Sequence, residues 1–194
     1  MAEFTTTSKE LYKNFKAVSF AMSGEKTRFY LCGACLDYDG EDLKLTATDG
    51  NRLHSIKLNW SKPDNLQPFQ HIIPAKFVKD LIRCKPKKSN DDDGACVTID
   101  GDNMAVNSII FSYATRFVDG TYPDYTRVIP TINIEEVHTV RLNTGYLAEI
   151  GKAVALMEGG CENVILQLPK DNRDPILIND CKGNIFVQMP MSIK

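Results

Sequence analysis

Apolar residues recur with helical periodicity in three segments of the chain, at residues 8–20, 74–84 and 144–157. In the first segment, Leu11 and Phe15 are followed by Val18, the i, i+4, i+7 spacing of a buried helical stripe. Strand-like runs follow each segment, so the pattern predicts three copies of a strand–helix–strands unit. The corresponding inward residues of the second segment are Phe77, Val78, Leu81 and Ile82.

An Asp-Gly turn flanked by alternating apolar residues recurs between these helices. The run YDGEDLKL at 38–45 is similar to IDGDNMAV at 99–106, and DCKGNIFV at 180–187 is a looser third copy. Such turns predict antiparallel hairpins. The predicted fold class is therefore α+β, with helices on one face of antiparallel sheets.

The repeat also predicts the domain organisation. We expect a complete domain over residues 1–121, made of units 1–62 and 63–121. A linker then covers residues 122–136, and residues 137–194 form an additional half-domain unit.

Composition indicates an ordinary globular protein. The chain has 194 residues, 43% of them hydrophobic and 25% charged, with a net charge of −2. No apolar run approaches the roughly 18 residues of a membrane span, and the first ten residues lack the apolar segment of a signal peptide. Six cysteines without such a signal favour reduced thiols. We expect a cytoplasmic protein that does not contact a membrane.

Basic residues occupy the far face of the first two predicted helices. The plain interpretation is a solvated surface. Two such stripes in an acidic chain would alternatively follow DNA phosphates without reading bases. The exposed residues expected for the third helix include Glu149, Lys152 and Glu158, so this copy gives no support for DNA contact. The basic residues are Lys9, Lys13 and Lys16 in the first helix and Lys76, Lys79 and Arg83 in the second.

The sequence contains only weak candidates for a metal-binding or catalytic motif. The C-x-x-C pair Cys32 and Cys35 falls in a predicted extended run, residues 28–38, where residues three apart point to opposite faces. The run NDDDG at 90–94 lacks the bidentate Glu of a calcium loop. We expect no catalytic residue, no metal and no cofactor. The three histidines, which have no partner constellation, are His54, His71 and His138.

Three runs carry a resemblance to a known family. ATDGNRL at 47–53, GTYPDYTRVIP at 120–130 and VQMPM at 187–191 resemble, in this order, motifs of the bacterial sliding clamps, the beta subunits of DNA polymerase III. Residues 2–130 resemble the middle domain, and residues from about 137 onward resemble the second half of the last domain. The resemblance implies a DNA-clamp fold, with helices lining a DNA hole and sheets forming the outer wall.

The resemblance also implies a protein-binding pocket. Its apolar Leu, Val, Met and Pro side chains would form an adaptable groove for a short linear motif. Asn51 stands where a histidine is common in the family, and Ser192-Ile193-Lys194 replaces a tail with Arg. Arg28 and Tyr30 match a loop that can touch DNA in the family. The pocket residues carried over are Leu31, Thr48, Gly50, Arg52, Leu53, Pro123, Arg127, Val128, Val187, Met189, Pro190 and Met191.

Two functions follow as expectations. The first is a homo-oligomeric ring around double-stranded DNA that tethers DNA polymerase and other proteins with clamp-binding motifs. Family rings close with twelve half-domain units, so chains of three units predict a tetramer. The second is a clamp-like interaction module without a ring, which sequesters or recruits clamp-binding proteins.

Overall fold

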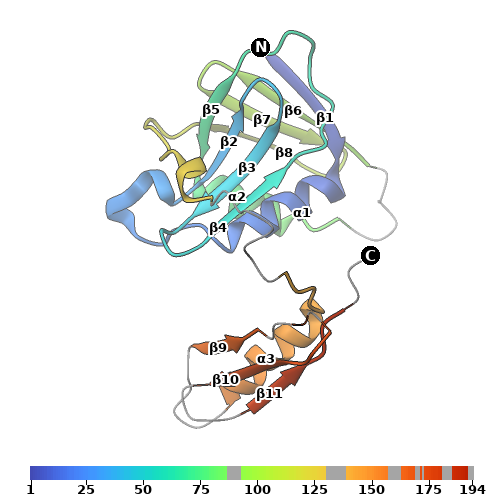
Figure 1. The fold of residues 1–194 in the computed structure, drawn as a ribbon. Helices are drawn as coiled ribbons and strands as arrows, with labels where there is room; N and C mark the ends of the chain where they lie inside the picture. The colour runs from blue at the N-terminus through green and yellow to red at the C-terminus, as the bar shows by residue number, and fades with distance from the viewer. Residues whose placement is uncertain are drawn as a thin grey trace. The chain divides into compact units, whose positions relative to one another are not determined.

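The computed structural model describes residues 1–86, 93–129, 139–156, 163–168, 171, 173–180 and 185–191. The chain divides into two compact units, Met1–Asp124 and Tyr125–Lys194, each taken by itself below (Figure 1). No helix among the described residues is long and apolar enough to cross a membrane.

The first unit contains two four-stranded antiparallel sheets (Figure 1). One has the order β4-β3-β2-β5 and the other the order β1-β6-β7-β8. Strands are interleaved with α1, α2 and the 3₁₀ helix η1. The bounds are β1 Ala2–Thr7, α1 Ser8–Ser19, η1 Lys26–Leu31, β2 Ala34–Tyr38, β3 Leu43–Thr48, β4 Leu53–Lys57, β5 Phe69–Ile73, α2 Ala75–Arg83, β6 Gly94–Asp100, β7 Asn103–Ser108 and β8 Ser112–Arg116.

Both predicted Asp-Gly hairpins of this unit are confirmed. Tyr38 pairs with Leu43 across the β2–β3 turn, where Gly40 has a φ of 103°. Asp100 pairs with Asn103 across the β6–β7 turn, where Gly101 has a φ of 55°. Glycine occupies this left-handed region without steric cost, which explains the recurring Asp-Gly pair.

The two repeats of the first unit exchange their first strands. β1 precedes α1 but pairs with β6, with Phe4 opposite Val97. β5 precedes α2 but pairs with β2, with His71 opposite Leu36. Each sheet therefore takes one edge strand from the other repeat, and a single hydrophobic core includes residues of both.

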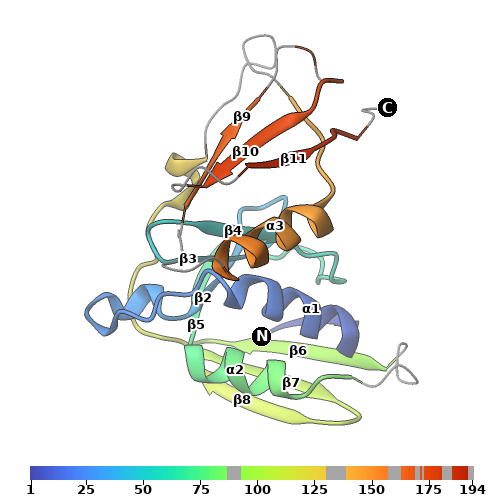
Figure 2. The same cartoon turned by 90° about the horizontal axis from the view of Figure 1, so that it is seen from below.

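The helices present the predicted faces. Leu11, Phe15 and Val18 are buried on α1, whose first turn is capped by the Thr7 hydroxyl accepting a 3.1 Å hydrogen bond from the N–H of Glu10. Phe77, Val78 and Leu81 are buried on α2. Figure 2 shows α1 and α2 next to one another in front of the strands, in agreement with the contacts between them. One side of the first unit is therefore formed by both helices.

The predicted extended run at 28–38 is wrong over its first half. Residues 26–31 form η1, and the strand begins only at Ala34. Local contacts override the apolar pattern: the Cys32 thiol donates to the carbonyl oxygen of Glu25 at 3.2 Å, and Phe29 packs edge-on against Tyr30. No group of three His, Cys, Asp or Glu residues among the described ones is arranged to hold a metal ion.

The second unit contains the short 3₁₀ helix η3 (Tyr125–Val128), the helix α3 (Thr144–Leu156) and a three-stranded antiparallel sheet in the order β11-β10-β9. The Asn143 side-chain oxygen accepts a 2.8 Å hydrogen bond from the N–H of Gly145 at the start of α3. The third turn that the sequence predicts, at 181–184, lies outside the described residues. The strands are β9 Val164–Gln167, β10 Ile176–Asp180 and β11 Ile185–Gln188.

Candidate functional site

The hairpin end between β3 and β4 is held by its own side chains. The Asp49 carboxylate accepts hydrogen bonds from the N–H groups of Asn51 at 3.0 Å and Arg52 at 3.1 Å. These bonds, the Asn51 bond first among them, hold the pKa of Asp49 below its ordinary value. The Thr48 hydroxyl donates to the carbonyl oxygen of Arg52 at 2.7 Å, and Gly50 has a φ of 92°. The result is a defined turn rather than a loose loop.

Arg52, one of the predicted pocket residues, is paired within this turn. Its Nε lies 2.9 Å from the Asp49 carboxylate, while its side chain remains 60% exposed. The guanidinium can still reach a ligand, but the Asp49 carboxylate offsets its positive charge.

The run at 120–130 meets the hairpin end between β3 and β4 at a tyrosine. Tyr122 is buried, and its phenolic oxygen accepts a 3.0 Å hydrogen bond from the N–H of Thr48. Pro123 is exposed next to it, Leu53 is half-buried at the start of β4, and Leu31 belongs to the core. Tyr122 was missed as a site residue, although an aromatic residue between Thr and Pro was the available signal.

The remaining predicted pocket residues lie in the second unit. Val128 and Arg127 are exposed on η3. Beyond the end of β11, the N–H of Met191 donates to the carbonyl oxygen of Arg141 at 2.7 Å. Assembly of the twelve residues into one pocket stays a prediction. The other members in this unit are Val187 and Met189, both exposed, and Pro190, which is half-buried.

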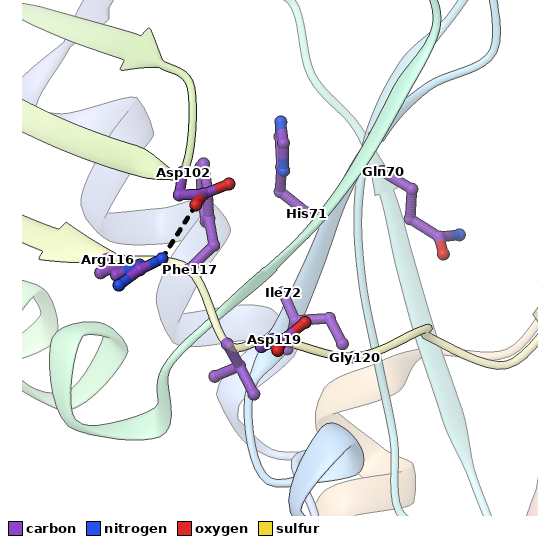
Figure 3. A pocket seen from close by; sticks show the side chains of 9 residues that line it. Gln70, His71, Ile72, Asp102, Arg116, Phe117, Asp119 and Gly120 are labelled. Atoms are coloured by element: carbon purple, nitrogen blue, oxygen red, sulfur yellow. Dashed lines mark hydrogen bonds and ion pairs between the residues drawn. The ribbon is translucent and has the colours of Figure 1, made fainter.

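Two cavities are lined wholly or mostly by residues outside the predicted pocket. One of about 420 Å³ lies between α3 and β11, and Val187 and Met189 contribute to its lining beside Tyr146 and Ile150. The other, of about 270 Å³, is drawn in Figure 3 and contains none of the predicted residues. Both were absent from the sequence predictions because neither follows from a local motif.

His71 lies at the wall of the cavity in Figure 3. Its ring stacks on Phe117 with centroids 4.1 Å apart and an angle of 3°, and it also stacks on Phe69. Burial lowers the pKa of His71, an effect that the nearby Asp102 carboxylate opposes. Arg116 forms a 3.0 Å ion pair with Asp102, and Asp119 adds a second carboxylate to the lining of this cavity (Figure 3).

Ion pairs neutralise part of the positive charge on the helix faces that were predicted to contact DNA. On α2, Asp80 pairs with Lys76 at 2.7 Å and Arg83 at 3.1 Å, and the Lys76 hydrogen bond is the main cause of the lowered pKa of Asp80. The sequence interpretation overlooked this carboxylate, although i,i+4 and i,i+3 spacing indicates such pairs. Lys79 is exposed on the same helix.

On α1 the predicted DNA-facing lysines differ in exposure. Lys13 is exposed, whereas Lys9 and Lys16 are half-buried, and the Lys16 ammonium lies 4.8 Å from the centre of the Phe20 ring. On η1, Arg28 forms a 3.0 Å ion pair with Glu25. Tyr30, also on η1, is half-buried. The most available cations are thus Lys13 and Lys79, one on each helix.

Two sheets that exchange edge strands around one core, with two cation-bearing helices on one side, define the class of DNA clamps. The family model described as DNA polymerase III beta subunit, central domain, matches residues 5–124. The chain belongs to this family. The family resemblance and the fold class expected from the sequence are therefore confirmed.

Individual relatives agree with this assignment. The beta sliding clamp of Escherichia coli K12 is 32% identical over 130 residues, 66% of this chain and 34% of that protein. The beta sliding clamp of Chlamydia muridarum is 30% identical over 153 residues, 79% of this chain and 40% of that protein. The matches thus span little more than a third of these curated relatives.

Solved structures share the fold. A DNA polymerase sliding clamp from Bacillus subtilis has a TM-score of 0.74 at 22% identity, covering 96% of this chain and 48% of that one. The sliding clamp from Pseudomonas aeruginosa has a TM-score of 0.68 at 21% identity, covering 98% of this chain and 67% of that one.

Proposed function

We propose that this protein is a clamp-like tether in DNA replication or repair, without catalytic activity of its own, that binds short motifs of DNA polymerase and other partners. The observation that carries the proposal is the hydrogen bond between Thr48 and Tyr122, because it joins the hairpin end to the run that leads to Pro123. A peptide groove needs such a fixed floor if its apolar anchors are to be bound at low entropic cost.

Peptide binding tests the groove. A fluorescent clamp-binding peptide should bind the wild-type protein, and Met189→Asp should weaken that binding at least tenfold because a carboxylate replaces an exposed apolar contact. Leu53→Asp should act in the same direction. Ile109→Asp, which makes the same change at an isoleucine 81% exposed in the turn between β7 and β8, is the matched control. Equal affinity in all four proteins would refute the groove.

The ring is the second part of the proposal. Four chains of three units would supply the twelve half-domains of a closed family ring, with α1 and α2 facing double-stranded DNA. Exposed cations on these helices support non-sequence-specific contact with phosphates. Salt-sensitive retention on circular DNA, with loss after linearisation, is the expected result. Equal retention on both forms would exclude encirclement.

The alternative is an interaction module that keeps the groove and forms no ring. The ion pairs of Asp80 with Lys76 and Arg83 favour it, because they reduce the cationic charge of α2. Peptide binding without any topological retention on DNA would select this alternative.

A further inference from the structure

The two repeats of the first unit carry ring side chains at corresponding positions of their first strands. In the first repeat, Phe4 lies three residues before Thr7, the N-cap of α1. In the second, His71 lies three residues before Pro74, the N-cap of α2. Both rings pack against Phe69, with centroids 6.3 Å away for Phe4 and 5.2 Å away for His71. His71 is therefore the positional counterpart of Phe4.

A second aromatic residue completes each stack. It stands just before an isolated bridge to the edge strand: Trp60 before the bridge to β1 and Phe117 before the bridge to β5. Phe4 and Trp60, with centroids 6.5 Å apart, are both buried, so aromatic rings fill this place in the first repeat. In the second repeat His71 is only half-buried, and the cavity of about 270 Å³ in Figure 3 lies against it. The cavity thus marks a place where the second repeat departs from the first.

The charged groups around this cavity favour a cation. Its lining contains two carboxylates, those of Asp102 and Asp119, and one guanidinium, that of Arg116. Burial lowers the pKa of His71, so its imidazole is neutral near pH 7. Asp102 and Arg116 pair with each other at 3.0 Å, which leaves the Asp119 carboxylate as a surplus negative charge. An anion in the cavity would be repelled by this carboxylate, whereas a cation would be attracted to it.

The lining also offers hydrogen-bond acceptors that the described part of the chain leaves available. No hydrogen bond or ion pair in that part engages the Asp119 carboxylate, the Gln70 amide or the ring nitrogens of His71. Figure 3 shows Asp102 and Arg116 on one side of His71 and Gln70 on the other. A neutral imidazole has one acceptor nitrogen, and a carboxylate accepts at both oxygens. A ligand that matches this lining therefore carries several N–H donors as well as a positive charge.

We propose that the cavity binds a guanidinium group, presented by an arginine side chain of a partner protein. A guanidinium is planar, has five N–H donors and pairs with a carboxylate through two parallel hydrogen bonds. Asp119 supplies the carboxylate for this pairing, and His71 supplies a neutral acceptor in the same lining. Asp119 and Gln70 are exposed at the opening, so a side chain can enter while its own backbone stays outside.

This site goes beyond the proposed function. The cavity lining shares no residue with the predicted peptide groove, and binding of a guanidinium there needs neither DNA nor the clamp-binding peptide. Loss of the groove would leave this site intact, and failure of this site would leave the groove intact.

Proton–carbon NMR of the full chain tests the site. L-Argininamide, an arginine side chain without a competing carboxylate, should shift the ring signals of His71 in a saturable manner. Those signals are assigned by their absence in His71→Phe. L-Citrullinamide, which has nearly the same shape but no charge on its side chain, should leave them in place. The ring signals of His54, which contacts the carbonyl oxygen of Ala17 on α1, should not move with either ligand.

Variants locate the binding. Asp119→Asn should weaken L-argininamide binding about tenfold or more, because it removes a charged acceptor from an exposed position. Asp64→Asn makes the same change at an exposed aspartate between β4 and β5, and this matched control should bind like the wild type. Phe117→Trp introduces the larger ring that the first repeat has at this place, so it should abolish binding without a change of charge. Circular dichroism verifies that the variants are folded.

L-Lysinamide distinguishes a guanidinium from an ammonium at equal charge. It should bind more weakly than L-argininamide, because an ammonium lacks the planar pair of donors. Tighter binding of L-lysinamide would overturn the assignment of the ligand. Unmoved His71 signals with L-argininamide, equal shifts with L-citrullinamide, or equal affinities of Asp119→Asn and Asp64→Asn would overturn the site.

Discussion

The N–H of Thr48 donates a hydrogen bond of 3.0 Å to the phenolic oxygen of Tyr122, although the two residues lie 74 positions apart. Tyr122 is only 2% exposed, so its ring is part of the interior and its oxygen has a fixed position. The bond therefore connects two stretches that the sequence could identify only as separate motifs.

Removal of this hydroxyl tests that connection. Tyr122→Phe should lower the free energy of unfolding of the first unit by about 1 kcal/mol, because one N–H loses its acceptor while the ring is kept. It should also weaken peptide binding several-fold. Urea unfolding followed by the fluorescence of Trp60, the single and buried tryptophan, measures the stability. Tyr12→Phe on α1 is the control, and an unchanged peptide affinity would separate Tyr122 from the groove.

Gly33 marks a close approach of two strands. A Cβ at this position would overlap the backbone carbonyl oxygen of Ile73 on β5, whereas a Cβ at Gly24 meets nothing within 4 Å. Gly33→Ala should therefore destabilise the first unit by about 2 kcal/mol, at the scale of an overpacked core. Gly24→Ala should change the urea midpoint only marginally. Similar midpoints for the two variants would contradict the tight packing of β2 against β5.

The sequence predicted the buried and exposed faces of α1 and α2 because periodicity directly encodes which side of a helix is apolar. It did not predict the strand exchange, because the alternation in β1 and β5 sets their faces and not their partners. The η1 helix was missed for a related reason: contacts among Glu25, Phe29 and Cys32 outweigh a run that looks extended. Pocket assembly also depends on long-range placement, so it stays a prediction.

The exposed lysines of the two helices should dominate any DNA contact. The double variant Lys13→Glu with Lys79→Glu should reduce DNA affinity and lower the salt dependence by about one counterion per lysine. Lys57→Glu is a control away from the helices: Lys57 pairs with Asp42, and His54 on the same strand contacts the carbonyl oxygen of Ala17 on α1, so alternation points Lys57 away from that helix. Equal losses in double variant and control would make the helix faces ordinary solvated surface.

Substitution of Asp80 should raise DNA affinity instead of lowering it. Asp80→Asn removes the carboxylate that pairs with Lys76 and Arg83, so both cations become available to phosphates. DNA affinity at low salt should rise several-fold, as measured by fluorescence anisotropy on a labelled duplex. Asp102→Asn, which removes a carboxylate from the β6–β7 turn, is the control. An affinity that falls or stays constant would show that α2 does not contribute to DNA binding.

His71 should make the first unit less stable in mild acid. Because burial lowers its pKa in the folded state, the unfolded chain binds the proton more readily. Stability should thus fall as the pH drops below about 6.5, the ordinary value for histidine, well above the range in which carboxylates such as Asp49 titrate. His71→Phe keeps a ring between Phe69 and Phe117 and removes the titration, so Trp60-monitored urea midpoints should become flat between pH 5 and pH 7. Asp102→Asn should steepen the acid loss instead, because that carboxylate favours the protonated imidazole. A wild-type profile that is already flat in this window would show that the His71 ring accepts its proton without cost to the fold.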